Sequence, residues 1–254
     1  MALPTLQSGS VVTINNANGS ISDSFLNIPL SAAGNNRVVI IACMSKDNSA
    51  VAAAVSTIAL DALGVNATLA NGKIVRIGTS QVAQESSFTS ICDVFYCLET
   101  NLPTSAASYT LDTTLTSGFQ YNMWVAFELT GATQAIDAFG ENLDLVNVAA
   151  GIAFSDSVTT IAADCIVLDF WGTSHSAAPL LTTSQTQVSF SSNTNGAATC
   201  SQINRATAGS QTMTEQLDQL HQRRAWKLVS VAGISAGGAG IEIFRRRIEA
   251  GRYN

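Results

Sequence analysis

The sequence predicts an all-β protein, an antiparallel jelly-roll-like β-sandwich with an extended basic C-terminal arm. Short apolar or alternating runs recur along the chain, and clusters of Gly, Asn, Ser and Pro separate them, as in all-β domains. Only Ser49–Ala54 and Glu215–Gln222 have a helix-like composition or spacing. Both are shorter than the roughly 12 residues that helical periodicity requires. After residue 234 the pattern changes to a glycine-rich stretch followed by arginines.

Strands are expected throughout the first half of the chain. Residues 38–44, VVIIACM, form an unbroken apolar run, which is typical of a strand covered on both faces. Residues 21–27 alternate instead, which is typical of a half-buried strand. The expected strands are Val11–Ile14, Ile21–Leu30, Val38–Met44, Val55–Leu60, Ala67–Leu69, Lys73–Ile77, Ser90–Leu98, Ser108–Leu115 and Met123–Leu129.

The second half repeats this pattern and then ends in the arm. Its expected strands are Gly151–Phe154, Ser157–Ile161, Cys165–Trp171, Gln187–Ser191, Ala197–Ile203, Gln211–Leu217 and Trp226–Ile234. The chain contains no repeat of fixed period and no Pro-rich linker. We therefore expect one β-sandwich domain over residues 1–234, followed by a Gly-rich hinge and basic arm over residues 235–254.

The composition excludes several classes of protein. The 254 residues are 46% hydrophobic and 12% charged, whereas disordered chains are poor in apolar residues and rich in charge. No stretch approaches the roughly 20 apolar residues of a bilayer span, so no membrane partner is expected. The net charge of −6 is unfavourable for binding phosphates, so no direct nucleic-acid partner is expected either.

The charge is divided unevenly between the body and the end of the chain. Residues 1–204 carry 4 basic and 14 acidic residues, a net charge of −10, whereas residues 205–254 carry 8 and 4, a net charge of +4. We expect the arm to contact an acidic surface on a neighbouring copy or on another protein, where opposite charge supplies register and steering. The expected contact residues are Ile241, Ile243, Phe244, Arg245, Arg246, Arg247, Ile248, Arg252 and Tyr253.

The cysteines and the N-terminus indicate a chain made in a reducing compartment. There are five cysteines, and none of them forms the CxxC motif of a zinc site or redox dithiol. We expect them to be small buried hydrophobic residues. The sequence begins MALPTLQSGS, which has neither the basic region nor the apolar core of a secretory signal.

The two histidines give little support to nucleophilic catalysis. His175 lies between Ser174 and Ser176, downstream of Asp169, but the chain has no GxSxG nucleophile elbow. His221 has the surroundings of a solvated surface histidine.

Carboxylate pairs and metal motifs give no stronger signal. The candidate pairs for acid–base work, Glu85/Asp93, Glu128/Asp137 and Glu141/Asp144, are scattered and carry no signature. Asp112 and Asp169 are expected to face solvent or cap turns. The chain lacks HExxH, EF-hand, GxGxxG and P-loop motifs. We therefore expect no enzyme, no catalytic residues, no cofactor and no transition-metal site, and leave a loop calcium open.

Trp124, Trp171 and Trp226 all lie in apolar runs. Alternation along a strand would point them into the core. The alternative is that they form a platform on which sugars stack.

Residues 20–234 resemble β-sandwich domains of tailed-phage virion proteins, of the capsid decoration, head or tail-fibre type. In these domains an Asn-Arg pair before an apolar strand, a YxL strand followed by Pro and a strand ending near Gly-Ala recur in this order. The matching segments here are Asn36–Ile41, Ser56–Leu60, Asp93–Leu98 with Leu102-Pro103, Ser108–Leu111, Val125–Gly131, Asp164–Asp169 and Ala225–Ala232. The resemblance carries no catalytic residues.

The resemblance implies a non-enzymatic structural protein of the virion. Such domains tend to stop after the last strand, and the added basic arm favours a capsid decoration or head-associated subunit over a fibre tip. We expect the protein to form a homo-oligomer and to bind other virion proteins, capsid or tail subunits. The alternative is a tail-fibre or baseplate carbohydrate-binding module that recognises a host-surface glycan. A third hypothesis is an esterase or glycosidase that uses His175 or a carboxylate pair.

Overall fold

The structure is a computed structural model, and it describes residues 2–16, 22–47, 55–62, 65–85, 88–116, 121–144, 153–173, 185–193, 196–216, 218 and 224–234. These residues form β-strands and one short 3-10 turn, η1 (Glu99–Asn101). Every strand pairing among them is antiparallel. The expected all-β, antiparallel fold is therefore confirmed.

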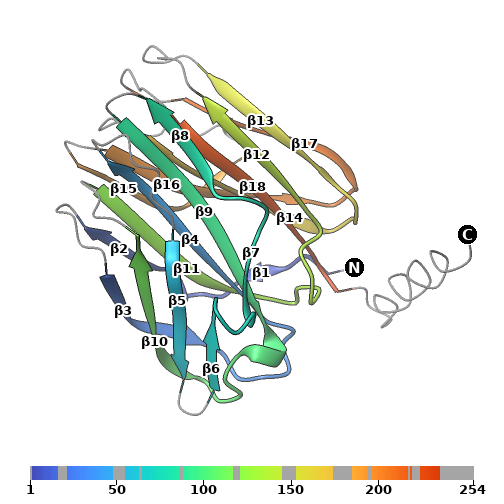
Figure 1. Ribbon diagram of the computed structural model, residues 1–254. Coiled ribbons are helices and arrows are strands. Elements are labelled where there is room, and N and C mark those ends of the chain that lie inside the picture. The colour runs from blue at the N-terminus through green and yellow to red at the C-terminus, as the bar shows by residue number, and fades with distance from the viewer. Residues whose placement is uncertain are drawn as a thin grey trace, which may run out of the picture.

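The strands form four sheets (Figure 1). The seven-stranded sheet contains, in order, β1 (Thr5–Leu6), β11 (Tyr121–Thr130), β4 (Val38–Asp47), β9 (Phe88–Leu98) and β7 (Ile74–Arg76), with β2 (Val12–Asn16) beside β11 and β8 (Gln81–Glu85) beside β9. The four-stranded sheet contains β3 (Ser22–Leu30), β10 (Ala107–Leu115), β5 (Val55–Ala62) and β6 (Val65–Thr68). The five-stranded sheet contains β12 (Ala138–Asp144), β18 (Arg224–Ala232), β14 (Cys165–Thr173), β16 (Gly196–Arg205) and β15 (Thr186–Asn193). The last sheet pairs β13 (Phe154–Thr160) with β17 (Gly209–Glu215).

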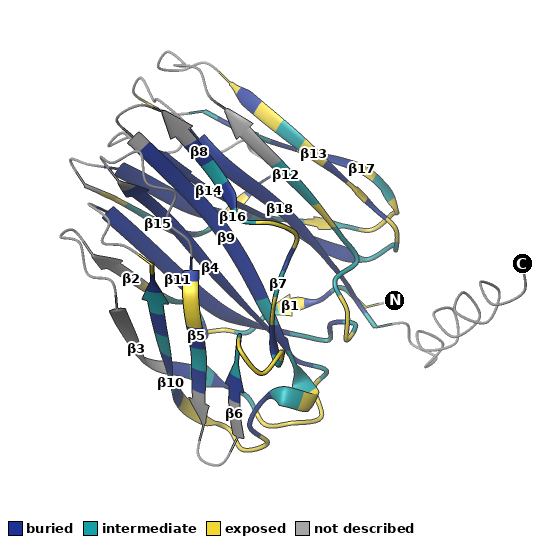
Figure 2. Ribbon diagram, in the orientation of Figure 1, coloured by how far each residue is buried: buried dark blue, intermediate teal, exposed yellow. Residues whose placement is uncertain are grey.

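Three hydrophobic cores lie between these sheets, so the sheets stack as four layers. The first core joins the four-stranded and seven-stranded sheets, and the second joins the seven-stranded and five-stranded sheets. The third core lies between the five-stranded sheet and the β13–β17 pair. Figure 2 shows the consequence: the strands of the two inner sheets are mostly buried, whereas exposed residues concentrate on the outer layers.

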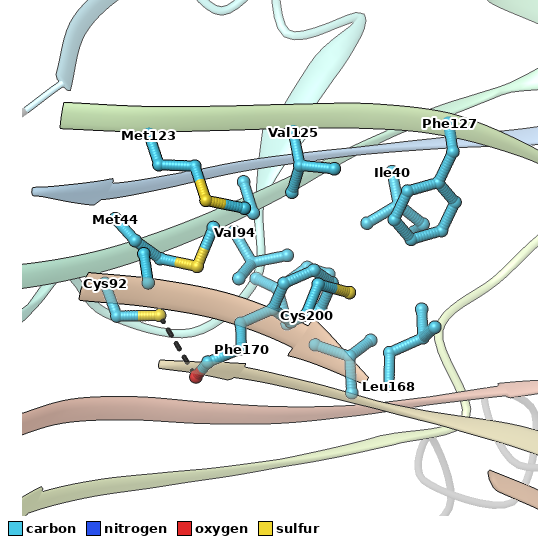
Figure 3. Packing of buried hydrophobic residues seen from close by; sticks show 14 of the residues in the cluster. Ile40, Met44, Cys92, Val94, Met123, Val125, Phe127, Leu168, Phe170 and Cys200 are labelled. Atoms are coloured by element: carbon cyan, nitrogen blue, oxygen red, sulfur yellow. Dashed lines mark hydrogen bonds between the residues drawn. The ribbon is translucent and has the colours of Figure 1, made fainter. Parts of the chain in front are cut away.

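The middle core explains why the inner strands are apolar without interruption. In β4, Val38, Ile40 and Ala42 face the five-stranded sheet, while Val39 and Ile41 face the four-stranded sheet. The expectation that residues 38–44 are covered on both faces is therefore confirmed. Figure 3 shows the packing between the inner sheets, where the rings of Phe127 and Phe170 stack with centroids 6.4 Å apart. The jelly-roll connectivity is not confirmed by this strand order.

Some strands differ from the sequence expectation. The described parts of the expected strands Gly151–Phe154 and Ser157–Ile161 lie in or next to the single strand β13, because Ser155 and Asp156 also pair with β17; residues 151 and 152 lie outside the described residues. β1, β8 and β12 carry no clear sequence signal; β12, for example, reads AFGENLD, in which Gly and charged residues interrupt the alternation. Ser49–Ala54 lies outside the described residues, and Glu215 ends β17. None of the described segments includes a helix long and apolar enough to cross a membrane.

The five cysteines, which form no disulfide bond, are buried, as the sequence predicts: Cys43, Cys92, Cys97, Cys165 and Cys200. Burial raises the pKa of Cys97 to about 12 and that of Cys165 to about 11. Since the thiolate is the nucleophile, we expect the native protein to react with Ellman's reagent more than about a hundredfold more slowly than the urea-unfolded chain. Rapid titration of one thiol in native conditions would contradict this prediction.

Candidate functional site

A groove opens on the surface where β7 faces the beginning of β12. Its volume is about 360 Å³. Val75, Phe139 and Ile161 are the exposed large hydrophobic residues of the described chain, with exposed fractions of 38%, 48% and 75%; the last two line the groove, and Val75 adjoins it. The lining residues are Arg76, Ile77, Gly78, Tyr96, Ile136, Asp137, Ala138, Phe139 and Ile161.

Asp137 fixes one side of the groove. Its carboxylate accepts hydrogen bonds from the backbone N–H groups of Ile161 (2.9 Å) and Ala162 (3.0 Å), and from the hydroxyl of Ser230 (3.1 Å). The backbone N–H of Asp137 also donates to the Ser230 carbonyl at 3.0 Å. These contacts tie the turn after β13 to β12 and β18, and so hold Ile161 at the rim.

Gly78 brings the other side of the groove close to β12. Its φ of +63° lies in the left-handed region that favours glycine. A Cβ at this position would overlap Glu141 Oε1 and would lie 2.7 Å from Phe139 Cε2. Only glycine therefore lets the chain after β7 pass this close to Phe139 without displacing it.

A buried lysine supports this wall from within. Lys227 Nζ donates to the carbonyls of Ile77 and Thr79, each at 2.6 Å, and pairs with Glu141 Oε1 at 3.1 Å. The backbone N–H of Thr79 donates to the same carboxylate at 2.7 Å. Partial burial opposes ionisation of Glu141, but these hydrogen bonds outweigh it and lower the pKa of the carboxyl. The wall is thus held by the buried ammonium group of Lys227, which hydrogen-bonds to two backbone carbonyls and pairs with Glu141.

A second cluster of polar side chains lies in the third core, away from solvent. Asp169 on β14 and Glu215 on β17 both have no exposed surface. Glu215 Oε1 accepts hydrogen bonds from Gln185 Nε2 (2.9 Å) and Ser201 Oγ (3.2 Å), and the Trp226 indole N–H donates to Asp169. The expectation that Asp169 faces solvent or caps a turn is therefore wrong, because β13 and β17 cover this face of β14.

The environment of this carboxyl pair favours protonation. Burial, followed by the charge of Glu215, raises the pKa of Asp169 well above its usual value. Burial likewise raises the pKa of Glu215 from its ordinary 4.5 to about 7, although hydrogen bonds to the carboxylate oppose it. The Arg224 guanidinium, which lies 3.4 Å from the Phe154 ring centroid, lowers the pKa of Asp169 only in part. Both carboxyls therefore favour the protonated form, and neither has exposed surface among the described residues.

Of the three expected carboxylate pairs, only Glu128/Asp137 has both side chains among the described residues, and these two carboxylates share no hydrogen-bond partner there; the side chains of Glu85 and Asp144 lie outside the described residues. Asp93 pairs with Arg76 at 3.5 Å, and burial raises the pKa of its carboxyl. Glu128 accepts from the N–H of Ser31 at 2.8 Å, far from the contacts of Asp137. Across the described ranges, no group of three or more His, Cys, Asp and Glu residues could hold a metal ion.

The expected arm residues, from Ile241 to Tyr253, lie outside the described residues, as do His175 and His221. The three tryptophans are confirmed as core residues, with exposed fractions of 0–1%. The groove residues Phe139 and Ile161 were not expected to be functional. The only signal for them is an apolar residue at a strand edge or in a turn, which is common on ordinary surfaces.

Comparison with known proteins adds no relative. No family model, curated protein or solved structure matches this chain. The candidate site is therefore defined by the geometry of the groove alone.

Proposed function

We propose that this chain is a non-enzymatic structural protein of a tailed-phage virion, a capsid decoration or head-associated subunit that oligomerises and binds neighbouring virion proteins. The observation that carries the proposal is the apolar groove at β7 and β12. Exposed apolar surface that gathers at one place, rather than being scattered, is typical of a site that another molecule covers. The acidic body and basic arm supply the charge complementarity that subunit assembly uses.

The glycan-binding alternative receives less support. It requires aromatic side chains at the surface on which sugar rings stack, whereas Trp124, Trp171 and Trp226 are buried in the cores. The groove offers Phe139 and Tyr96, but its exposed apolar neighbours fit a protein side chain better than a hydroxyl-rich ligand.

The proposal is tested by incorporation into particles. We expect mass spectrometry and immunogold labelling to locate the chain on the head of purified virions. The double variant Phe139→Asp/Ile161→Asp is expected to incorporate at least about tenfold less than wild type, since two charges would enter an apolar interface. Thr57→Asp is the matched control, because it places a charge at an exposed position on the outer four-stranded sheet. Absence of the chain from purified particles would overturn the proposed function.

A further inference from the structure

We propose that the groove between β7 and β12 receives residues 241–248 of a second copy of this chain. The inference rests on the proposed assembly function and names the partner of the same site. Residues 241–248 read IEIFRRRI, with four apolar side chains and three arginines. The groove offers exposed apolar surface of matching character at Phe139 and Ile161.

Charge favours this occupant over a contact between two bodies. Residues 1–234 carry 8 basic and 16 acidic residues, a net charge of −8, so two bodies repel each other when they meet directly. Residues 241–254 carry four arginines and two glutamates, and so bring net positive charge to a body of net negative charge, although the groove lining itself has one basic and one acidic residue, Arg76 and Asp137. An arm that inserts into the neighbour's groove supplies apolar area and opposite charge in one contact.

The chain leaves the body near the groove. The N–H of Gly233 donates to the Asp164 carbonyl at 2.9 Å, and the N–H of Ile234 donates to the Gly131 carbonyl at 3.0 Å. Ser230, whose carbonyl bonds to Asp137 in the groove wall, lies four residues before Ile234, which is about 13 Å along a strand. The six residues 235–240 span up to about 20 Å more when extended. Two bodies that touch near this exit therefore place each arm within reach of the other's groove.

The direction of β18 favours a second copy over the same copy. β18 runs along the five-stranded sheet and ends at the edge of the body (Figure 1). To enter its own groove, which lies beside Val229 and Ser230, the chain would have to turn back within residues 235–240, whereas a neighbour placed ahead of the end of β18 can receive it without that turn. In a two-fold pair each copy also gives one arm and receives one, which doubles the contact.

The test is site-specific photo-crosslinking in the full-length chain. Unlabelled protein with benzoylphenylalanine in place of Phe244 is mixed with ¹⁵N-labelled wild type and irradiated over a dilution series. We expect crosslinks between unlabelled and labelled chains that map to Ile136–Phe139 or to Ile161. Phe139→Asp in the labelled copy is expected to reduce them about tenfold, whereas Thr57→Asp is expected to leave them unchanged. Phe139 is half exposed, and a thermal melt checks that its variant remains folded.

Any other crosslinking result overturns the inference. Crosslinks confined to one unlabelled chain would mean that the arm covers its own groove. Crosslinks that map to another surface, or none at all, would mean that the arm does not occupy the groove. If these crosslinks fail while the chain is found in virions and the groove variant still lowers incorporation, the proposed function stands and the groove binds a different virion protein.

Discussion

Replacing Glu215 by glutamine is expected to remove the loss of stability that ionisation of Glu215 causes in the wild-type protein between pH 4.5 and about 7. Burial raises the pKa of Glu215 from 4.5 to about 7 on folding, so the folded state holds this proton more tightly than the unfolded chain. Between those two values the folded state binds more protons, and stability therefore falls as the pH rises. A pKa change of this size corresponds to about 3 kcal/mol.

The measurement is urea denaturation of the wild type and of Glu215→Gln at pH 5 and pH 8. The substituted amide would keep an acceptor for Gln185 and Ser201, so the two proteins are expected to be similar at pH 5. At pH 8 the variant is expected to be more stable by about 3 kcal/mol, because only the wild type must ionise Glu215, whereas Asp169 is present in both proteins. Equal differences at both pH values would show that Glu215 does not titrate in this range.

Glu141→Gln is the control, because folding lowers the pKa of Glu141 whereas it raises the pKa of Glu215. The pKa of Glu141 is lowered on folding, so its contribution is present above pH 4.5 and lost as the pH falls below it. This variant is expected to be destabilised by nearly the same amount at pH 5 and pH 8. The pair of variants therefore separates titration of one buried group from a general effect of pH on the fold.

The fold could be predicted from the sequence to the extent that burial follows local pattern. The run at residues 38–44 predicted a strand with two covered faces, and β4 is buried on both. The stacking of four layers could not be predicted, because apolar runs show that a strand is covered but not which sheet covers it. β12 was missed because its apolar pattern is interrupted and its partner, β18, lies about 90 residues away.

The candidate site was less predictable than the fold. Asp169 and Glu215 lie on different sheets, and no spacing in the sequence connects them. From its residue type alone, Asp169 is expected at the surface, as most carboxylates are, but tertiary packing buries it here. Phe139 pairs with Val229 but remains exposed on β12, the edge strand of the five-stranded sheet, and the order of strands in a sheet is not visible in the sequence. The arm was recognisable because its charge differs from everything before it.

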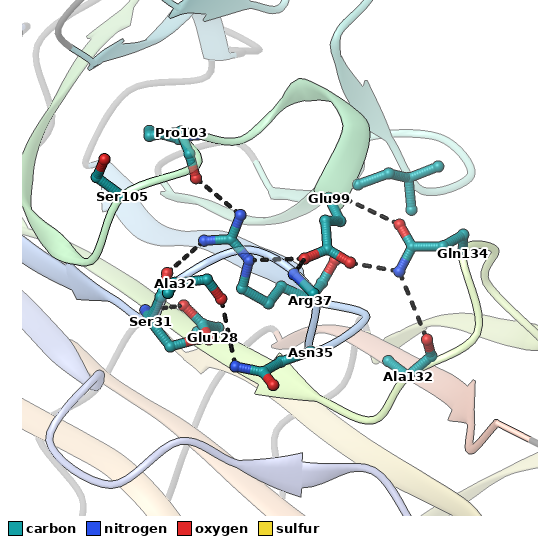
Figure 4. A network of polar contacts seen from close by, with 12 residues as sticks. Ser31, Ala32, Asn35, Arg37, Glu99, Pro103, Ser105, Glu128, Ala132 and Gln134 are labelled. Carbon is teal, nitrogen blue, oxygen red and sulfur yellow. Dashed lines mark hydrogen bonds and ion pairs between the residues drawn. The ribbon is translucent and has the colours of Figure 1, made fainter.

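Arg37→Ala is expected to destabilise the protein by about 3–5 kcal/mol, since it removes a buried guanidinium that pairs with the partly exposed Glu99 and binds two carbonyls. Arg37 has no exposed surface. Its Nε donates to Glu99 Oε1 at 3.1 Å, and its two terminal nitrogens donate to the carbonyls of Ser31 and Pro103 (Figure 4). The loss is measured by urea denaturation at pH 7.

Two conservative variants separate charge from geometry. Arg37→Lys keeps the charge but cannot reach all three acceptors, so we expect about half of the alanine loss. Glu99→Gln is expected to cost only about 1 kcal/mol, because the side chain keeps its bond from the N–H of Gly34. Burial opposes ionisation of Glu99, but bonds from Gly34 and Arg37 outweigh it and lower its pKa, so this contribution disappears below pH 4.5.

The size of the Arg37 effect follows from where its acceptors lie. Ser31 begins the connection from β3 to β4, and Pro103 lies in the connection from β9 to β10. These two connections each cross between the four-stranded and seven-stranded sheets, and one guanidinium binds both. Loss of Arg37 would remove the donor of a part-buried carbonyl, that of Ser31, and of a buried one, that of Pro103, in both crossings at once. Arg37→Ala within about 1 kcal/mol of wild type would mean that the apolar first core alone holds the two sheets together.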